Sequence, residues 1–200
     1  MRNVRTTLLI SGALAAVLTF AGCASGSGSY QGMEGMDHGS SSAPATEASF
    51  NSADVMFAQM MIPHHEQAVE MSDVLLAKEG VDQQVLDLAQ QIKDAQQPEI
   101  DQLREWLTAW GEDESDPSGM DHNMDGMMSE DDMAVLEQAS GADAARLFLQ
   151  QMVVHHEGAI TMAQTEVDEG ENPDAKAMAE EIVATQSDEI ATMQDLLATL

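Results

Sequence analysis

The chain has 200 residues, of which 36 are acidic and 7 are Lys or Arg, so its formal net charge is −29 at pH 7. This charge repels nucleic acid and anionic lipid headgroups, which excludes both as binding partners. The chain is long enough for one domain with a single core, and its only cysteine excludes an intrachain disulfide.

The first 22 residues are typical of a targeting segment. Arg2 and Arg5 precede an apolar stretch at residues 8–20, and small residues lead to Cys23. This arrangement resembles a bacterial lipoprotein signal, in which Cys23 becomes the first residue and carries a lipid. We therefore expect a signal peptide at 1–22 and a lipid-anchored protein on the extracytoplasmic face of the cell membrane. An ordinary secretory signal with an incidental cysteine is the alternative.

Residues 23–50 are rich in Ser, Gly and Ala, which predicts a flexible tether. Helical periodicity dominates residues 51–200, and no segment alternates with period two over a useful length. Caps and glycine stops place helices at 52–79, 82–110, 129–140, 142–169 and 173–200, with Asn51 or Ser52, Ser129 and Asn172 as N-caps and Gly80, Gly111 and Gly170 as stops. A Met-rich loop spans 111–128. The predicted fold class is all-α.

Two of these helices carry the same motif, which indicates an internal duplication. The first copy reads Phe57, Met61, His64, His65, Glu66, Ala68 and Met71, and the second, at one constant offset, reads Phe148, Met152, His155, His156, Glu157, Ala159 and Met162. The helix that follows each copy carries Gln-x-x-Glu-Ile, at residues 96–100 and 186–190. Two such helical hairpins can bury their apolar faces against each other, which predicts a four-helix bundle.

The repeated motif has steps of four and three residues, which is the spacing of the inward face of a bundle helix. His64 and His155 fall on this face, and the next residue, His65 or His156, lies at its edge. Histidine beside thioether sulfur suggests a site for a soft or borderline metal ion. The candidate ligands are Met61, His64, His65, Met71, Met152, His155, His156 and Met162.

The hairpin loops supply polar partners for these histidines. His64 precedes Gly80 by as many residues as Gln96 follows it, so the two are expected at the same height. Gln96, Glu99, Gln186 and Glu189 fall on apolar faces, where uncompensated polar groups are costly. We expect these four residues to orient the imidazoles rather than to bind metal directly.

The methionine in each motif favours copper over iron. Dinuclear iron bundles need Glu-x-x-His on two helices, but here Met61 and Met152 stand at the glutamate position. A thioether there favours Cu(I), Cu(II) or silver. Further methionines and histidines outside the predicted helices form secondary candidates that would bind ions loosely: Met33, Met36, His38, Met120, His122, Met124, Met127 and Met128.

At these residues the chain resembles a bacterial family of unknown function whose CopM-like members bind copper outside the cytoplasm. The resemblance covers about residues 51–200 and rests on the segments 61–66, 152–157 and 126–129 and on the two Gln-x-x-Glu-Ile segments. It implies a ferritin-like four-helix bundle and a role in copper binding or resistance. Val154 stands where the first copy has Pro63, so the two sites need not be equivalent.

The sequence thus predicts an extracytoplasmic protein that sequesters or delivers copper without turnover, with a copper-exchange protein as a possible partner. An alternative is a redox metalloenzyme, either a cuprous oxidase or a dinuclear iron oxygenase, supported by the carboxylates of the polar layer. A third interpretation is an acidic module that binds a partner protein and uses the histidines only as buried hydrogen-bonding groups.

Overall fold

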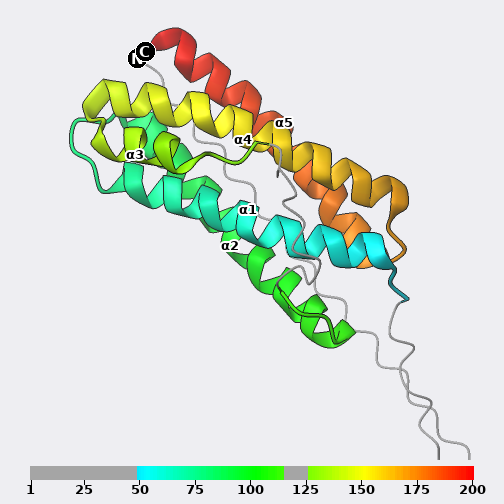
Figure 1. Cartoon of the computed structure of the whole chain (residues 1–200). Coiled ribbons are helices and arrows are strands. Elements are labelled where there is room, and N and C mark those ends of the chain that lie inside the picture. The colour runs from blue at the N-terminus through cyan, green and yellow to red at the C-terminus, as the bar shows by residue number, and fades with distance from the viewer. Residues whose placement is uncertain (1–48, 115–125) are drawn as a thin grey trace, which may run out of the picture. The chain divides into compact units, whose positions relative to one another are not determined.

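The computed structural model describes residues 49–114 and 126–200, and every regular element within these ranges is a helix. Four helices are long: α1 (Ser52–Leu76), α2 (Gln83–Trp110), α4 (Gly141–Glu169) and α5 (Pro173–Thr199). The short α3 (Glu130–Gln138) lies between the two halves in sequence (Figure 1). The all-α prediction is confirmed.

Local sequence explains where the helices begin. Asn51 and Ser129 each form a capping box, with Asp54 and Asp132 as the respective third helical residues. Asn172 accepts hydrogen bonds from two backbone amides of α5, and Pro173 occupies its first turn, where a missing N–H costs nothing. These side chains satisfy amides that a helix cannot satisfy itself, and so they fix where α1, α3 and α5 begin.

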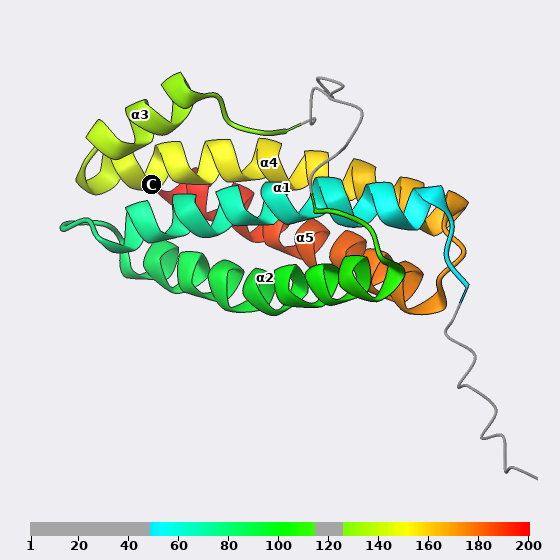
Figure 2. The ribbon, with the colours of Figure 1, turned by 60° about the horizontal axis from the view of Figure 1, so that its bottom comes forward.

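The long helices form two antiparallel hairpins, in which α1 packs against α2 and α4 against α5. The hairpins meet along α1 and α4, while α3 lies against the same two helices (Figure 2). This is the four-helix bundle expected from the repeat. Among the described residues, no helix is long and apolar enough to cross a membrane.

The core of the bundle has two apolar clusters, one on each side of its middle. One cluster includes Met71, Leu75 and Phe148, and the other includes Phe57, Ile100 and Ile182. Between them in sequence, on each of the four long helices, lie buried polar residues: His64, His65, Gln96, His155, His156 and Gln186. We call these six residues the histidine layer.

Helix boundaries differ from the prediction chiefly at the end of α1. It ends at Leu76, not at residue 79, and Gly80 adopts a φ of +74° within the following turn. Lys78 in this turn donates hydrogen bonds to the carbonyls of Glu137 and Ala139, beside α3. These hydrogen bonds join the turn to the end of α3. Gly170 ends α4 as expected, but with extended rather than left-handed backbone.

Several predicted features lie outside the described residues. They are the signal peptide, Cys23, most of the tether, and the secondary candidates Met33, Met36, His38, Met120, His122 and Met124.

Candidate metal centre

The two halves of the molecule meet through equivalent histidines. The ring centroids of His64, on α1, and His155, on α4, lie 3.7 Å apart at an interplanar angle of 39°. His65 and His156 flank them, with centroids 6.5 Å from His64 and 6.4 Å from His155, respectively. All four side chains are fully buried. The rings thus lie close together in the bundle interior, where the inward spacing of the motif places them.

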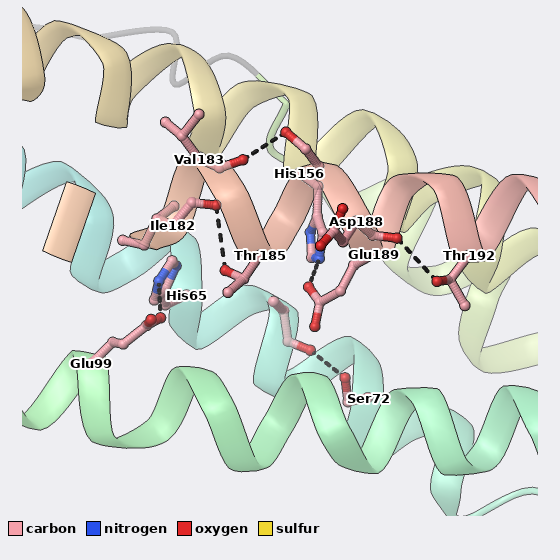
Figure 3. Close-up of polar contacts among 12 residues, drawn as sticks. His65, Ser72, Glu99, His156, Ile182, Val183, Thr185, Asp188, Glu189 and Thr192 are labelled. Atoms are coloured by element: carbon pink, nitrogen blue, oxygen red, sulfur yellow. Dashed lines mark hydrogen bonds and ion pairs between the residues drawn. The ribbon is translucent and has the colours of Figure 1, made fainter. Parts of the chain in front are cut away.

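A carboxylate from the neighbouring helix orients each outer imidazole. His65 Nε2 lies 2.9 Å from Glu99 Oε2, and His156 Nε2 lies 2.7 Å from Glu189 Oε2 (Figure 3). Both glutamates are about one-fifth exposed, whereas the imidazoles are buried. The carboxylate favours the tautomer that carries its proton on Nε2, because this nitrogen can then donate the hydrogen bond.

The Nδ1 atoms of His65 and His156 then carry the lone pairs. Neither atom has a hydrogen-bond partner among the described residues, and both are buried. A carboxylate that accepts a proton from one ring nitrogen makes the other a better metal donor. Both outer histidines are therefore suited to bind a metal ion through Nδ1.

The register of the hydrogen bonds between α1 and α2 differs from the prediction, which placed His64 level with Gln96. In the structure, the bonded pair is His65 with Glu99. Side chains lean towards the N-terminus of their own helix. In an antiparallel hairpin, the residue on the second helix therefore lies more residues away from the turn than its partner on the first helix. Gln96 and Gln186 are buried, but the amide of Gln96 has no hydrogen-bond partner in the described part of the chain.

The electrostatic environment keeps His155 neutral. Burial lowers the pKa of His155 well below its ordinary value, and the neighbouring His64, His156 and His65 lower it further. A buried imidazole with a low pKa is unprotonated at neutral pH. Neutral imidazole is the form that binds metal ions.

The four methionines of the repeated motif occupy two kinds of position. Met61 and Met152 are fully buried, one in each apolar cluster, and each precedes a central histidine by three residues. Met71 and Met162 follow the central histidines by seven residues, which is about 10 Å along a helix. The first pair is therefore close enough in sequence to share an ion with the histidines, whereas the second pair lies two turns away.

A short non-helical segment, residues 126–129, crosses α1 and α4 beside the histidine layer, and we call it the strap. The Met128 amide donates to Gln67 Oε1 at 2.7 Å, and Gln67 Nε2 donates to the Met128 carbonyl at 2.8 Å. A Cβ on Gly126 would lie 3.0 Å from the carbonyl oxygen of His155. Of the predicted secondary candidates, Met127 and Met128 thus lie on a segment held next to the histidines.

The described residues contain no group of three or more His, Cys, Asp or Glu side chains that could hold one metal ion. Glu99 and Glu189 are engaged with imidazole nitrogens. The available donors are imidazole nitrogens and thioether sulfurs, which suit copper and silver.

Sequence reasoning missed two features at the end of the bundle where α1 begins. Asp54 and Glu166 form a buried carboxyl pair, and Met56 and Met60 line a cavity together with Met162. The spacing of Met56 and Met60, one turn apart on α1, was the available signal. The carboxyl pair joins residues far apart in sequence, so no local pattern reveals it.

The buried pair shares a proton. Burial, the hydrogen bond to Asp54 and the charge of Asp54 raise the pKa of Glu166 to about 8. Burial also opposes ionisation of Asp54, but hydrogen bonds from the Asn51 amide, from Glu166 and from the amides of Asn172 and Glu171 hold its pKa below the ordinary value. Glu166 is therefore the proton donor, and Asp54 anchors the start of α1 to the α4–α5 turn.

Comparison with solved structures shows what this arrangement is similar to. A DUF305 protein from Streptomyces coelicolor is 34% identical, with a TM-score of 0.70 over 74% of this chain and 93% of the other. A DUF305 fragment from Deinococcus radiodurans is 33% identical, with a TM-score of 0.68 over 75% and 98%. CopM in its Cu(II)-bound form is 27% identical, with a TM-score of 0.63 over 73% and 96%.

CopM has also been solved with Cu(I) and with Ag bound. No curated protein matches this sequence. Residues 54–197, which include the whole histidine layer and the strap, match the family described as a domain of unknown function, DUF305. The chain therefore belongs to the DUF305 family, within which it resembles CopM.

Proposed function

We propose that this protein binds copper at the histidine layer and that it sequesters or hands over the ion without turnover. The observation that carries the proposal is the set of four buried imidazoles, two of which have Nε2 bound to a carboxylate and Nδ1 without a partner among the described residues. Such nitrogens are costly to bury unless they bind something.

The chemistry of the donors supports copper rather than a hard ion. Imidazole nitrogen and thioether sulfur suit Cu(I) and Ag(I), whereas calcium and magnesium need several oxygen ligands. The residues that would hold copper are imidazoles of the four histidines, no more than two to an ion, together with the thioethers of Met61 and Met152 one turn away on the same helix faces. The solved copper and silver complexes of CopM, a structural neighbour, support the same class of ion.

Titration of the purified protein tests this proposal. Wild type and a variant with His64, His65, His155 and His156 changed to Ala are titrated with Cu(I), in competition with a chromophoric chelator, and separately with Cu(II). We expect the variant to lose the tightly bound Cu(I). Unchanged stoichiometry and affinity would place copper binding elsewhere in the chain. An oxygen-uptake assay of the copper-loaded protein should show no turnover, and sustained uptake would favour the redox-enzyme alternative.

We further propose that Cys23 carries a lipid that anchors the protein on the extracytoplasmic face of the cell membrane. The support is the signal-like sequence at residues 1–23. Wild type should fractionate with membranes and incorporate labelled palmitate, whereas Cys23→Ser should do neither. A wild-type protein recovered entirely without lipid would contradict the anchor and leave the copper proposal intact.

A further inference from the structure

A second group of thioethers lies away from the histidine layer. A cavity of about 310 Å³ is bounded by the first two turns of α1 and the last two turns of α4. Its walls include the side chains of Met56, Met60 and Met162, together with Glu166 and Glu169. The proposed copper site uses neither this cavity nor Met56 and Met60.

The helix geometry brings the three sulfur-bearing side chains together. Met56 and Met60 are four residues apart, so they lie one above the other on α1. The contact between His64 and His155 sets the register of the antiparallel helices α1 and α4. Phe57, seven residues before His64, therefore lies level with Met162, seven residues after His155. Thioethers from two helices thus face one cavity.

These methionines do not serve simply as core filler. Met56 is 49% exposed, and Met60 and Met162 are only partly buried. Met61 and Met152, by contrast, are fully buried members of the apolar clusters, whereas Met162 only packs against one of them. A methionine that lines an accessible cavity leaves its sulfur lone pairs open to a ligand from solvent.

The cavity also has a buried polar wall. Glu166 is 1% exposed, and neither of its oxygens accepts a hydrogen bond from a described residue. Glu169 lines the same cavity and is exposed. Because Glu166 keeps its proton and donates it in a hydrogen bond to Asp54, it presents a neutral carboxyl group to the cavity. An apolar guest would leave its carbonyl oxygen without a partner, whereas a cation would find a neutral oxygen donor there beside the thioethers.

We propose that Met56, Met60 and Met162 form a second soft-metal site, which takes a monovalent ion such as Cu(I) or Ag(I) with Glu166 as the adjoining oxygen donor. Thioethers select soft ions over the hard cations that carboxylates alone would attract. This inference rests on the proposed function and extends it to the end of the bundle. The ligands of the two sites are different residues, so experiments can disprove either site without disproving the other.

The test uses Ag(I) as a redox-inert probe and the full-length protein labelled with ¹³C at its methionine methyl groups. On addition of Ag(I), we expect the methyl resonances of Met56, Met60 and Met162 to shift together. The variant M56L/M60L/M162L should bind one Ag(I) fewer than wild type by native mass spectrometry. Leucine conserves volume, so this variant should fold. The matched control M133L/M178L/M193L should bind as many Ag(I) ions as wild type.

The variant without the four histidines separates the two sites. We expect its Met56, Met60 and Met162 methyl resonances still to shift with Ag(I), even though the histidine-bound ion is lost. If that variant does not fold, the same resonances in wild type provide the measurement. The proposal is overturned if these resonances stay in place, or if M56L/M60L/M162L binds as many Ag(I) ions as wild type with equal affinity.

Discussion

At the residue scale, the most consequential contacts are the two imidazole–carboxylate pairs. His65 with Glu99 and His156 with Glu189 repeat one geometry in both halves of the molecule. Each carboxylate fixes the ring orientation and directs an Nδ1 lone pair into the interior. These glutamates therefore set the basicity of the proposed ligands without binding the metal themselves.

Changing both carboxylates to amides should weaken copper binding. We expect E99Q/E189Q to bind Cu(I) about 10–100-fold more weakly than wild type, because an amide accepts the imidazole proton less strongly. Competition with a chromophoric chelator measures the change. The control E105Q/E180Q alters two exposed glutamates on the same helices and removes the same charge. Equal losses in the two variants would show that net charge, rather than ring orientation, governs affinity.

The carboxyl pair at the start of α1 gives stability a specific pH dependence. Folded Glu166 keeps its proton up to about pH 8, whereas its ordinary pKa is 4.5. Between these values the folded state binds more protons than the unfolded state, so the pair's contribution to stability falls as pH rises. Asp54, with its lowered pKa, contributes stability that is lost only in acid, as pH falls through that pKa.

Glu166→Gln removes this titration, because an amide can donate to Asp54 at every pH. We expect the free energy of unfolding of the variant, relative to metal-free wild type, to rise steadily from pH 5 to pH 8. Urea titrations at several pH values measure the difference in unfolding free energy between the variant and wild type. The contributions of the histidines cancel in this difference because both proteins contain them. E169Q, on the same turn of α4, should follow wild type. Parallel wild-type and E166Q profiles would contradict the shared proton.

At the element scale, the strap depends on one glycine. Gly126 has a φ of +88°, and a Cβ there would lie 2.7 Å from the Val154 carbonyl oxygen and 3.0 Å from the Cα of Gly158. The strap therefore packs directly on the α4 backbone, which only glycine permits. The paired hydrogen bonds of Gln67 with Met128 hold its other side to α1.

Gly126→Ala should detach the strap and destabilise the protein by about 1–3 kcal/mol, because backbone strain and a steric conflict combine. Gly111→Ala is the matched control: Gly111 has a φ of +75°, but a Cβ there would meet nothing within 4 Å. The excess loss of unfolding free energy in G126A measures the strap contact. Faster hydrogen exchange at the Met128 amide should accompany it. Equal losses in both variants would mean that the contact contributes no stability.

At the scale of the whole molecule, the sequence predicts the fold well because its signals are local and repeated. The spacing of Phe57, Met61 and His64 marks an inward face, and Asn51 and Asn172 mark helix starts, as the structure confirms. The sequence also identifies Glu99 and Glu189 as residues that orient the histidines. Its prediction of the register is wrong, because it placed Gln96 level with His64, whereas the bonded pair is His65 with Glu99.

What the sequence did not predict depends on contacts between distant segments. The turn after the early end of α1 is joined to the end of α3 through Lys78. The position of Met162 at a cavity, rather than at the histidines, follows from the way α1 and α4 pass each other. The pair of Asp54 and Glu166 forms only when the α4–α5 turn meets the start of α1. No periodicity within one helix encodes these outcomes.

Metal binding should stabilise the whole bundle, because the proposed ligands come from both hairpins. One equivalent of Ag(I) should raise the thermal unfolding midpoint of wild type by more than that of the variant without the four histidines, which keeps only the proposed site at Met56, Met60 and Met162. Differential scanning calorimetry measures both. An equal increase in the two proteins would place the stabilising ion outside the histidine layer.

His64 meets its own counterpart, His155, across the boundary between the two repeats. A contact between equivalent residues is what a two-fold axis produces when identical subunits associate. A polypeptide half as long, carrying a single copy of the repeat, could therefore rebuild all four imidazoles by dimerising. Fusion of two such copies would free each half to diverge, as Pro63 and Val154 have done.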